Sequence, residues 1–191
     1  LLPLLTVLER DPAARVVILP SDHYVQDEAL LADSLRRAVA HVDDESQSVT
    51  LLGIKPDSPD AEYGWIEAEP ASGALRRVRR FLEKPDVAEA VRAFERGALW
   101  NSFLFAGSAR TIVGLLAQRV PETYLALRSW SFLSRDERSS TLAELYEQLP
   151  NADFSRDVLQ GSESSLRVLE VPHCGWTDLG TTRRVAECLR V

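Results

Sequence analysis

The 191-residue sequence contains no methionine and only two cysteines, Cys174 and Cys188. Neither cysteine belongs to a C-x-x-C pair or has a histidine at metal-binding spacing. We therefore expect free thiols in a reducing, cytoplasmic compartment and no zinc site. No apolar run approaches the length that crosses a bilayer, and no secretion signal is visible, so we expect no membrane partner.

The sequence also lacks an excess of basic residues. Lys and Arg number 22 against 29 Asp and Glu, which gives a formal net charge of −7. A nucleic-acid-binding surface needs a basic face, so we expect no nucleic-acid partner. Small phosphorylated ligands remain compatible with this charge, because a few local cations suffice to bind them.

The chain starts on an apolar run, Leu1 to Leu5, with no helix-capping residue before it. Together with the absent initiator methionine, this start indicates that an N-terminal part is missing. The 45% hydrophobic content is enough for one core of ordinary size, so we expect a single domain over residues 1–191. We also expect the missing strands to leave a sheet edge or apolar surface exposed, which favours a homo-oligomer.

Hydrophobic periodicity predicts strands that alternate with helices, which is typical of an α/β fold. The predicted strands are 15–19, 48–54, 63–67, 75–83, 99–106 and 166–171. The predicted helices are 1–10, 28–42 (capped by Asp27), 85–96, 109–119, 121–130, 140–148 and 183–190. The turn residues Pro70 to Gly73 predict a hairpin, and helix 85–96 is expected to bury Val87, Ala90, Val91 and Phe94.

The segment 15–19 is the one around which a site would be organised. Its short, β-branched run predicts a buried strand of a parallel sheet, and Pro20 ends it. Asp22 then lies just past the carboxyl end of a strand, where open α/β sheets bind ligands. Asp22 is a candidate metal ligand, or it caps the helix that follows.

Four more polar clusters follow predicted strands. They are Tyr63-Gly64, Glu83-Lys84-Pro85, Trp100-Asn101-Ser102 and Trp176-Thr177-Asp178-Leu179-Gly180. Taken singly, each has a structural explanation: a helix entry for Glu83-Lys84-Pro85, core aromatics for the tryptophans, and turns for the glycines.

Six motifs, in this order, resemble those of the sugar-nucleotide pyrophosphorylases, and more specifically of the mannose-1-phosphate guanylyltransferases. They are P-S-D-H-Y (20–24), G-I-x-P (53–56), E-Y-G-W-I-E (62–67), R-F-x-E-K-P-D (80–86), W-N-S-x-L-F (100–105) and G-W-x-D-L-G-T (175–181). The resemblance covers nearly the whole chain. It implies a Rossmann-like nucleotidyltransferase sheet flanked by helices, with the N-terminal strand or strands missing.

The resemblance implies a reaction of GTP with mannose 1-phosphate that gives GDP-mannose and pyrophosphate. Three anionic groups must meet, so catalysis is mostly positioning and charge neutralisation, to which Mg²⁺ contributes. Asp22 and Asp178 match the family's two metal-ligand aspartates, and Lys84 matches the lysine that pairs with the sugar phosphate. These three would be the catalytic residues.

The sugar side is implied in the same way. Glu83 matches the residue that accepts hydrogen bonds from sugar hydroxyls, and Asn101 can both donate to and accept from a hydroxyl. Gly64 lets the backbone approach the sugar closely, and Tyr63 stands beside it among the substrate-binding candidates.

The chain departs from the family pattern at two places. The glycine-rich nucleotide-binding signature G-G-x-G-x-R-L-x-P-L is absent, so we expect this polypeptide alone to be inactive. The glycine that usually follows W-N-S is Phe103. Arg183 and Arg184 can touch phosphate or lie on a solvated helix face, of which we favour the latter. His23 and His173 are expected to be structural.

Two other functions stay open at the sequence level. One is a related enzyme that uses glucose 1-phosphate or N-acetylglucosamine 1-phosphate with UTP or dTTP. The other is a non-catalytic regulatory paralogue that binds a sugar nucleotide. The presence of both Asp22 and Asp178 favours an enzyme, because a sensor has little need of two metal ligands.

Overall fold

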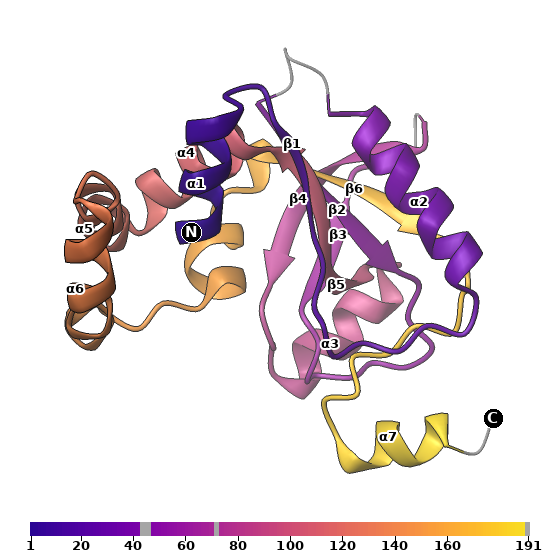
Figure 1. Ribbon diagram of the computed structural model, residues 1–191. Coiled ribbons are helices and arrows are strands. Elements are labelled where there is room, and N and C mark those ends of the chain that lie inside the picture. Colours follow the sequence, from indigo (N-terminus) through magenta and orange to yellow (C-terminus); the bar gives the residue numbers. More distant parts are fainter. Residues whose placement is uncertain (43–46, 71–72, 190–191) are drawn as a thin grey trace.

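The computed structural model describes residues 1–42, 47–70 and 73–189, as a mixed sheet flanked by helices (Figure 1). Its helices are α1 (Leu2–Arg10), α2 (Glu28–Ala40), α3 (Val87–Glu95), α4 (Ala109–Arg119), α5 (Pro121–Ser131), α6 (Arg135–Gln148) and α7 (Thr182–Cys188). Its strands are β1 (Arg15–Ile18), β2 (Val49–Ile54), β3 (Trp65–Ala68), β4 (Leu75–Leu82), β5 (Leu99–Ser108) and β6 (Leu166–Val171). The predicted α/β class is confirmed.

The strands form one sheet in the order β1-β5-β2-β6-β4-β3, and β3 also pairs with β5. The pair β2–β6 is parallel, whereas β5 runs antiparallel to β1, β2 and β3. All six residues of β2 are buried, as predicted for 48–54. The strands β3 and β4 form the predicted antiparallel hairpin, although residues 71–72 of its turn lie outside the described residues.

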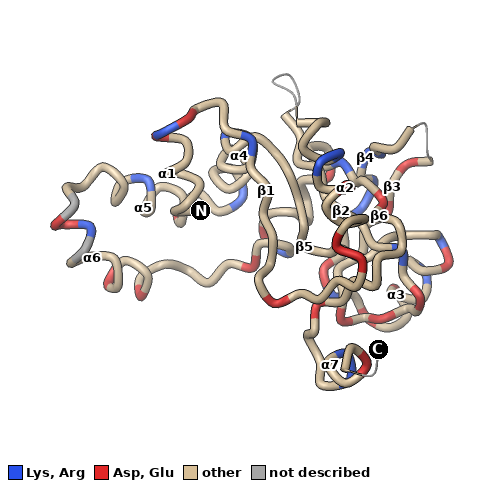
Figure 2. The backbone as a smooth tube through the Cα atoms, turned by 45° about the vertical axis from the view of Figure 1, so that its right-hand side comes forward, with Lys and Arg blue, Asp and Glu red and all other residues tan. Residues whose placement is uncertain are grey.

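Helices cover both faces of the sheet, and each face has its own apolar cluster. One cluster joins the sheet to α1, α4 and α5, which lie to the left in Figure 1. The other joins it to α2 and α3. Basic and acidic residues are interspersed along the backbone in Figure 2. Within the described residues, no helix has the length and apolar character that a bilayer crossing requires.

The prediction that 15–19 is a buried strand of a parallel sheet is wrong. β1 stands first in the strand order and pairs antiparallel with β5, and its side chains alternate between exposed and half-buried. Val16 and Ile18 pack on the core, whereas Val17 and the following Leu19 are exposed. The apolar run resembles a fully buried strand because its outward positions are also apolar.

Two helices also differ from their predictions. In α3, Ala90 and Ala93 face the core, while Val87 and Phe94 are exposed. Small side chains let this helix lie close to the sheet, so the inward face follows the alanines instead of the larger residues. Helix α6 begins before residue 140, because Ser134 and Glu137 form a capping box.

Several local signals were predicted correctly. Asp27 caps α2 by accepting a hydrogen bond from the Leu30 N–H at 3.1 Å, so the cap role proposed as an alternative for Asp22 belongs to Asp27. Asp86 caps α3. Cys174 and Cys188 are free thiols. A π-helical turn, Phe154–Leu159, and a 3-10 turn, Glu163–Ser165, were not predicted.

A bulge in β5 determines where Asn101 lies. Leu51 pairs with Phe105 but Gly53 pairs with Asn101, so β5 carries two extra residues at this point. The Ser102 hydroxyl stabilises the bulge with two hydrogen bonds. It donates to the Leu52 carbonyl at 2.6 Å and accepts from the Leu104 N–H at 3.2 Å. The bulge turns the start of β5 so that its first residues also reach β3.

Candidate functional site

Two segments far apart in the sequence are joined at one end of the sheet: residues 20–27, after β1, and residues 172–181, after β6. Tyr24 and Thr177 exchange backbone hydrogen bonds of 2.9 and 3.0 Å. The Trp176 indole N–H donates to His23 Nδ1 at 3.1 Å. The pairing brings the stretches that carry Asp22 and Asp178 side by side, although neither lies on a strand.

The pKa of His23 depends on its burial and on the charges of two nearby carboxylates. Burial lowers the pKa of His23, and the negative charges of Asp22 and Asp178 partly oppose that shift. The imidazole is therefore neutral at pH 7, which leaves Nδ1 free to accept from Trp176. This contact supports the structural role predicted for His23. His173 also has a local contact, since its Nδ1 accepts from the Gly175 N–H.

Asp178 is held from several sides, whereas Asp22 is exposed. Asp178 Oδ1 accepts from the Gly180 N–H at 2.9 Å and from Arg184 Nη1 at 2.9 Å, and the Tyr63 hydroxyl lies 3.4 Å away. A Cβ at Gly180 would stand 3.0 Å from Asp178 Oδ2, so a side chain there would press on this carboxylate. The loop W-T-D-L-G thus orients one carboxylate.

Arg184 was expected on a solvated helix face, and that expectation is wrong. Only 5% of Arg184 is exposed, and its guanidinium binds Asp60 at 2.7 Å as well as Asp178. Its neighbour Arg183 is the exposed one. No pattern in the sequence pairs Arg184 with Asp60, because the two residues are 124 positions apart.

Tyr63 supports Asp178 with its side chain. Its ring packs on Trp100 with centroids 4.4 Å apart, and Arg184 lies over it at 3.9 Å. Burial raises the pKa of Tyr63 to about 12, so the phenol stays protonated and can donate to Asp178. The ring of Tyr63 therefore belongs to the interior behind the site. Its backbone leads directly to Gly64.

Gly64, Glu83 and Asn101 meet at the other side of Tyr63. A Cβ on Gly64 would lie 2.8 Å from Glu83 Oε2 and 3.2 Å from Asn101 Cβ. The Asn101 N–H donates to the Gly64 carbonyl at 2.7 Å. Three residues that the sequence separates by up to 37 positions thus form one small polar cradle, which we call the Gly64–Glu83–Asn101 cradle.

The unpredicted π-helical turn borders this cradle. The Glu83 N–H donates to Gln160 Oε1 at 3.1 Å. Burial raises the pKa of Glu83 and the charge of Asp153 adds to the shift, whereas Lys84, Arg156 and a hydrogen bond from Ser155 oppose it. The π-helical turn is the part of the site that sequence reasoning missed, and turns of this kind recur at functional sites.

Left-handed backbone conformations at non-glycine residues occur in the motif segments. Among the residues described, three other than glycine have positive φ: Lys84 (43°), Phe103 (57°) and Leu179 (54°). They belong to E-K-P, W-N-S-F and W-T-D-L-G, respectively. Such conformations cost energy and cluster at sites where the surroundings fix the geometry. The left-handed backbone at position 103 explains why the related motif has glycine where this chain has Phe103.

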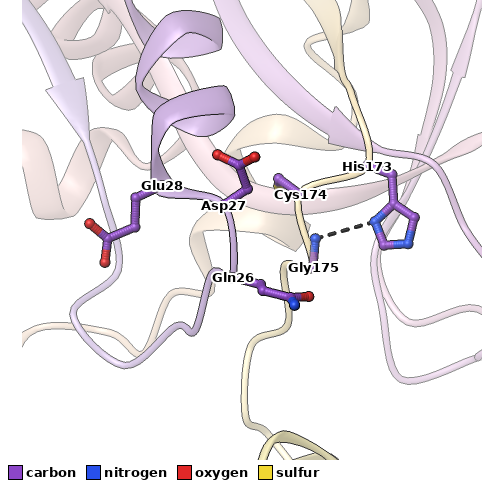
Figure 3. Close-up of a pocket in the computed structure, with 6 residues that line it drawn as sticks. All are labelled: Gln26, Asp27, Glu28, His173, Cys174 and Gly175. Carbon is purple, nitrogen blue, oxygen red and sulfur yellow. Dashed lines mark hydrogen bonds between the residues drawn. The ribbon is translucent and has the colours of Figure 1, made fainter. Parts of the chain in front are cut away.

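The surface around these segments is hollowed in two places. An open cavity of about 850 Å³ lies where the two joined segments meet, lined by Gln26, Asp27, Glu28, His173, Cys174 and Gly175 (Figure 3). None of these six is a residue predicted for the site. A second cavity of about 360 Å³ lies by α7, and Tyr63, Trp100, Trp176 and Arg184 are among its lining residues.

Asp22 and Asp178 are the two carboxylates that this region offers to a magnesium ion that also binds substrate. Within the described part of the chain, no group of three or more His, Cys, Asp or Glu side chains could hold a metal. Mg²⁺ in phosphoryl-transfer sites is held by one or two carboxylates together with substrate phosphates, and Asp22 and Asp178 supply such a pair. Asp178 Oδ2 has Arg184 Nη1 as its hydrogen-bond partner, at 3.2 Å.

Comparison with known proteins gives similar relatives. The chain is 31% identical over 170 residues to the xanthan biosynthesis protein XanB of Xanthomonas campestris, covering 87% of this chain and 35% of that protein. It is 26% identical over 182 residues to a putative mannose-1-phosphate guanylyltransferase of Vibrio cholerae, covering 92% of this chain and 38% of that protein. The chain thus spans somewhat more than a third of the length of these relatives.

A solved structure has the same fold. A Thermus thermophilus protein described as a mannose-1-phosphate geranyltransferase matches 100% of this chain and 54% of its own, with a TM-score of 0.82 and 29% identity. The sequence profile of the family described as nucleotidyl transferase matches residues 3–189. That match extends across the β1 and β6 segments and the Gly64–Glu83–Asn101 cradle, and so the chain belongs to the nucleotidyl transferase family.

Proposed function

We propose that this chain carries the sugar-binding and metal-binding half of a mannose-1-phosphate guanylyltransferase. The reaction joins GTP to mannose 1-phosphate and releases pyrophosphate as GDP-mannose forms. The observation that carries the proposal is the Gly64–Glu83–Asn101 cradle, whose Gly64 follows directly on Tyr63, the residue whose hydroxyl contacts Asp178. The name of the Vibrio relative, a putative mannose-1-phosphate guanylyltransferase, agrees with this substrate class.

The sugar ring would occupy the cradle. Glu83 would accept hydrogen bonds from two sugar hydroxyls, and Asn101 would exchange them with a third. Because Gly64 has no side chain, its backbone would approach the ring closely. The exposed Lys84 would then reach the 1-phosphate, for which a compact ammonium is suited.

Asp22 and Asp178 would hold Mg²⁺ together with phosphate oxygens. The bound ion would neutralise charge on the α-phosphate that the sugar phosphate attacks. The chain's own contribution would be to align the attacking phosphate through Lys84 and the cradle. The two free thiols are consistent with a cytoplasmic location for this chemistry.

Calorimetric titration of mannose 1-phosphate into the chain, with magnesium present, tests the sugar half. We expect binding that weakens at least tenfold in Lys84→Ala, with glucose 1-phosphate binding more weakly than mannose 1-phosphate. Arg77→Ala serves as the control, because it removes a cation from β4 outside the cradle. Tighter binding of glucose 1-phosphate would instead favour the related enzymes that use that sugar.

Pyrophosphate release from GTP and mannose 1-phosphate tests the reaction itself. We expect no turnover by this polypeptide on its own, since its sequence has no glycine-rich triphosphate loop. Turnover equal to that of a longer relative would contradict this expectation. Binding of GDP-mannose with no effect of Asp178→Asn would favour a regulatory paralogue.

A further inference from the structure

Arg184 is a buried cation with two carboxylates bound to it. It lies in the first turn of α7, and Thr181 caps that helix. Its Nη2 donates to Asp60 Oδ2 at 2.7 Å, and its Nη1 contacts both oxygens of Asp178, at 2.9 and 3.2 Å. The guanidinium plane also covers the Tyr63 ring, which closes it off from water on that side.

Each charge in this group is already compensated. Burial disfavours ionisation of Asp60, but hydrogen bonds from the Glu62 N–H and from Arg184 lower its pKa overall. Burial likewise opposes the charge of Arg184, yet the contact with Asp60 raises its pKa overall. Asp60 and Arg184 are therefore charged at pH 7, and the Arg184 guanidinium lies within hydrogen-bond distance of Asp178.

The two oxygens of Asp178 are not equivalent. Oδ1 accepts from Gly180 and Arg184 and lies within reach of Tyr63. Oδ2 contacts Arg184 at the longer distance of 3.2 Å. Held by Oδ1, the carboxylate presents Oδ2 to an ion. A divalent cation that binds Oδ2 must nevertheless approach a guanidinium, and that repulsion lowers the affinity of the site for the free ion.

We propose that Arg184 is a positioning residue that fixes Asp178 and keeps the affinity of the site for a free divalent cation low. The ion then binds together with an anionic substrate, whose phosphate oxygens offset the charge of Arg184. This inference rests on the proposed role of Asp178 as a metal ligand. It adds that Arg184 makes metal binding depend on substrate.

The test uses Mn²⁺ as a spectroscopic probe for the divalent site. Free Mn²⁺ is measured by electron paramagnetic resonance during titration of the chain. We expect Arg184→Gln to bind Mn²⁺ about tenfold more tightly than the parent chain, because removal of a unit charge near a divalent ion outweighs the loss of one carboxylate contact. Arg184→Lys keeps the charge and should keep the binding weak.

Two controls make the result specific. Arg183→Gln removes the same charge from the adjacent position, whose guanidinium approaches Asp60 at 3.5 Å and is exposed. We expect that variant to change Mn²⁺ affinity less than threefold. Thermal melting of each variant shows whether it is folded, and a folded Arg184→Lys keeps the comparison informative should Arg184→Gln not fold.

A further arm separates this inference from the proposed function. Addition of mannose 1-phosphate should tighten Mn²⁺ binding by the parent chain more than by Arg184→Gln. If Asp178→Asn leaves Mn²⁺ binding unchanged, Asp178 is no metal ligand and the proposed function loses its metal site. If Asp178→Asn abolishes binding but Arg184→Gln binds no more tightly than the parent, the role given to Arg184 is wrong while the metal site stands.

Discussion

Gly64 and Glu83 approach so closely that a methyl group on Gly64 would stand 2.8 Å from Glu83 Oε2. The nearest atom ends the flexible Glu83 side chain, whereas Asn101 Cβ, at 3.2 Å, belongs to β5. A substitution at Gly64 therefore displaces chiefly the carboxylate that is proposed to bind the sugar, so we expect binding to suffer more than stability.

We expect Gly64→Ala to weaken mannose 1-phosphate binding at least tenfold while it costs the fold no more than about 1 kcal/mol. Calorimetry and chemical denaturation measure the two quantities. Gly114→Ala is the matched control: a Cβ there meets open space on α4, so it should stabilise by about 0.5–1 kcal/mol and leave binding unchanged. Unaltered binding in Gly64→Ala would contradict the cradle.

Glu83 should make stability depend on pH. Its pKa is raised in the folded chain, so between the unfolded value of 4.5 and the folded value the native state holds more protons than the unfolded state. The contribution of Glu83 to stability is therefore lost as pH rises through the folded pKa. We expect Glu83→Gln to melt about 2 °C higher than the parent at pH 7 and equally below pH 4.

The same Glu83→Gln variant should bind mannose 1-phosphate about tenfold more weakly, because an amide accepts fewer hydrogen bonds than a carboxylate. Glu144→Gln on α6 is exposed and serves as the control for both measurements. A melting difference that persists at low pH would assign the effect to packing instead of charge.

Phe103 holds a left-handed backbone at φ 57° while its ring packs edge-on against Phe105 and Phe154. We expect Phe103→Gly to be about 1 kcal/mol more stable than Phe103→Ala, since both lose the ring and only alanine strains the backbone. Urea denaturation of the pair measures the difference. At Phe105, in ordinary strand geometry, the alanine variant should be the more stable one.

Self-association remains a prediction for this chain. β1 ends the strand order, and Val17 and Leu19 are exposed along it. Such an edge can pair with another copy. We expect light scattering to detect dimers that the double variant Val17→Lys and Leu19→Lys converts to monomers. Leu125 is exposed on α5, away from β1, so Leu125→Lys should leave the mass of the particle in solution unchanged. A monomeric parent chain would contradict the prediction.

The sequence could predict features that depend on neighbours along the chain. Asp27 caps its helix because the cap is a local hydrogen bond, and the β3–β4 hairpin was indicated by the turn residues Pro70 to Gly73. The six ordered motifs indicated the family, and the family profile that matches residues 3–189 confirms it. The motifs could not predict contacts between residues far apart in the sequence, such as the hydrogen bond between Asp60 and Arg184.

Errors arose where the side-chain pattern was ambiguous. Apolar residues on both faces of β1 imitate a buried strand. In α3 the burial of Ala90 was predicted, but that of Ala93 was missed because larger apolar residues suggested a different face. The π-helical turn beside Glu83 has no periodicity that would identify it in a short polar segment. Tertiary packing decided each case, so local patterns were insufficient.

The bond between His23 and Trp176 joins residues that are 153 positions apart. During translation, the first carboxylate of the proposed metal pair leaves the ribosome long before the second has been made. The nascent chain therefore has no complete site until the segment after β6 emerges, and closing so large a loop is slow. A truncation or stalled synthesis before β6 would yield a protein that has the cradle and Asp22 but lacks Asp178, the second carboxylate of the proposed metal pair.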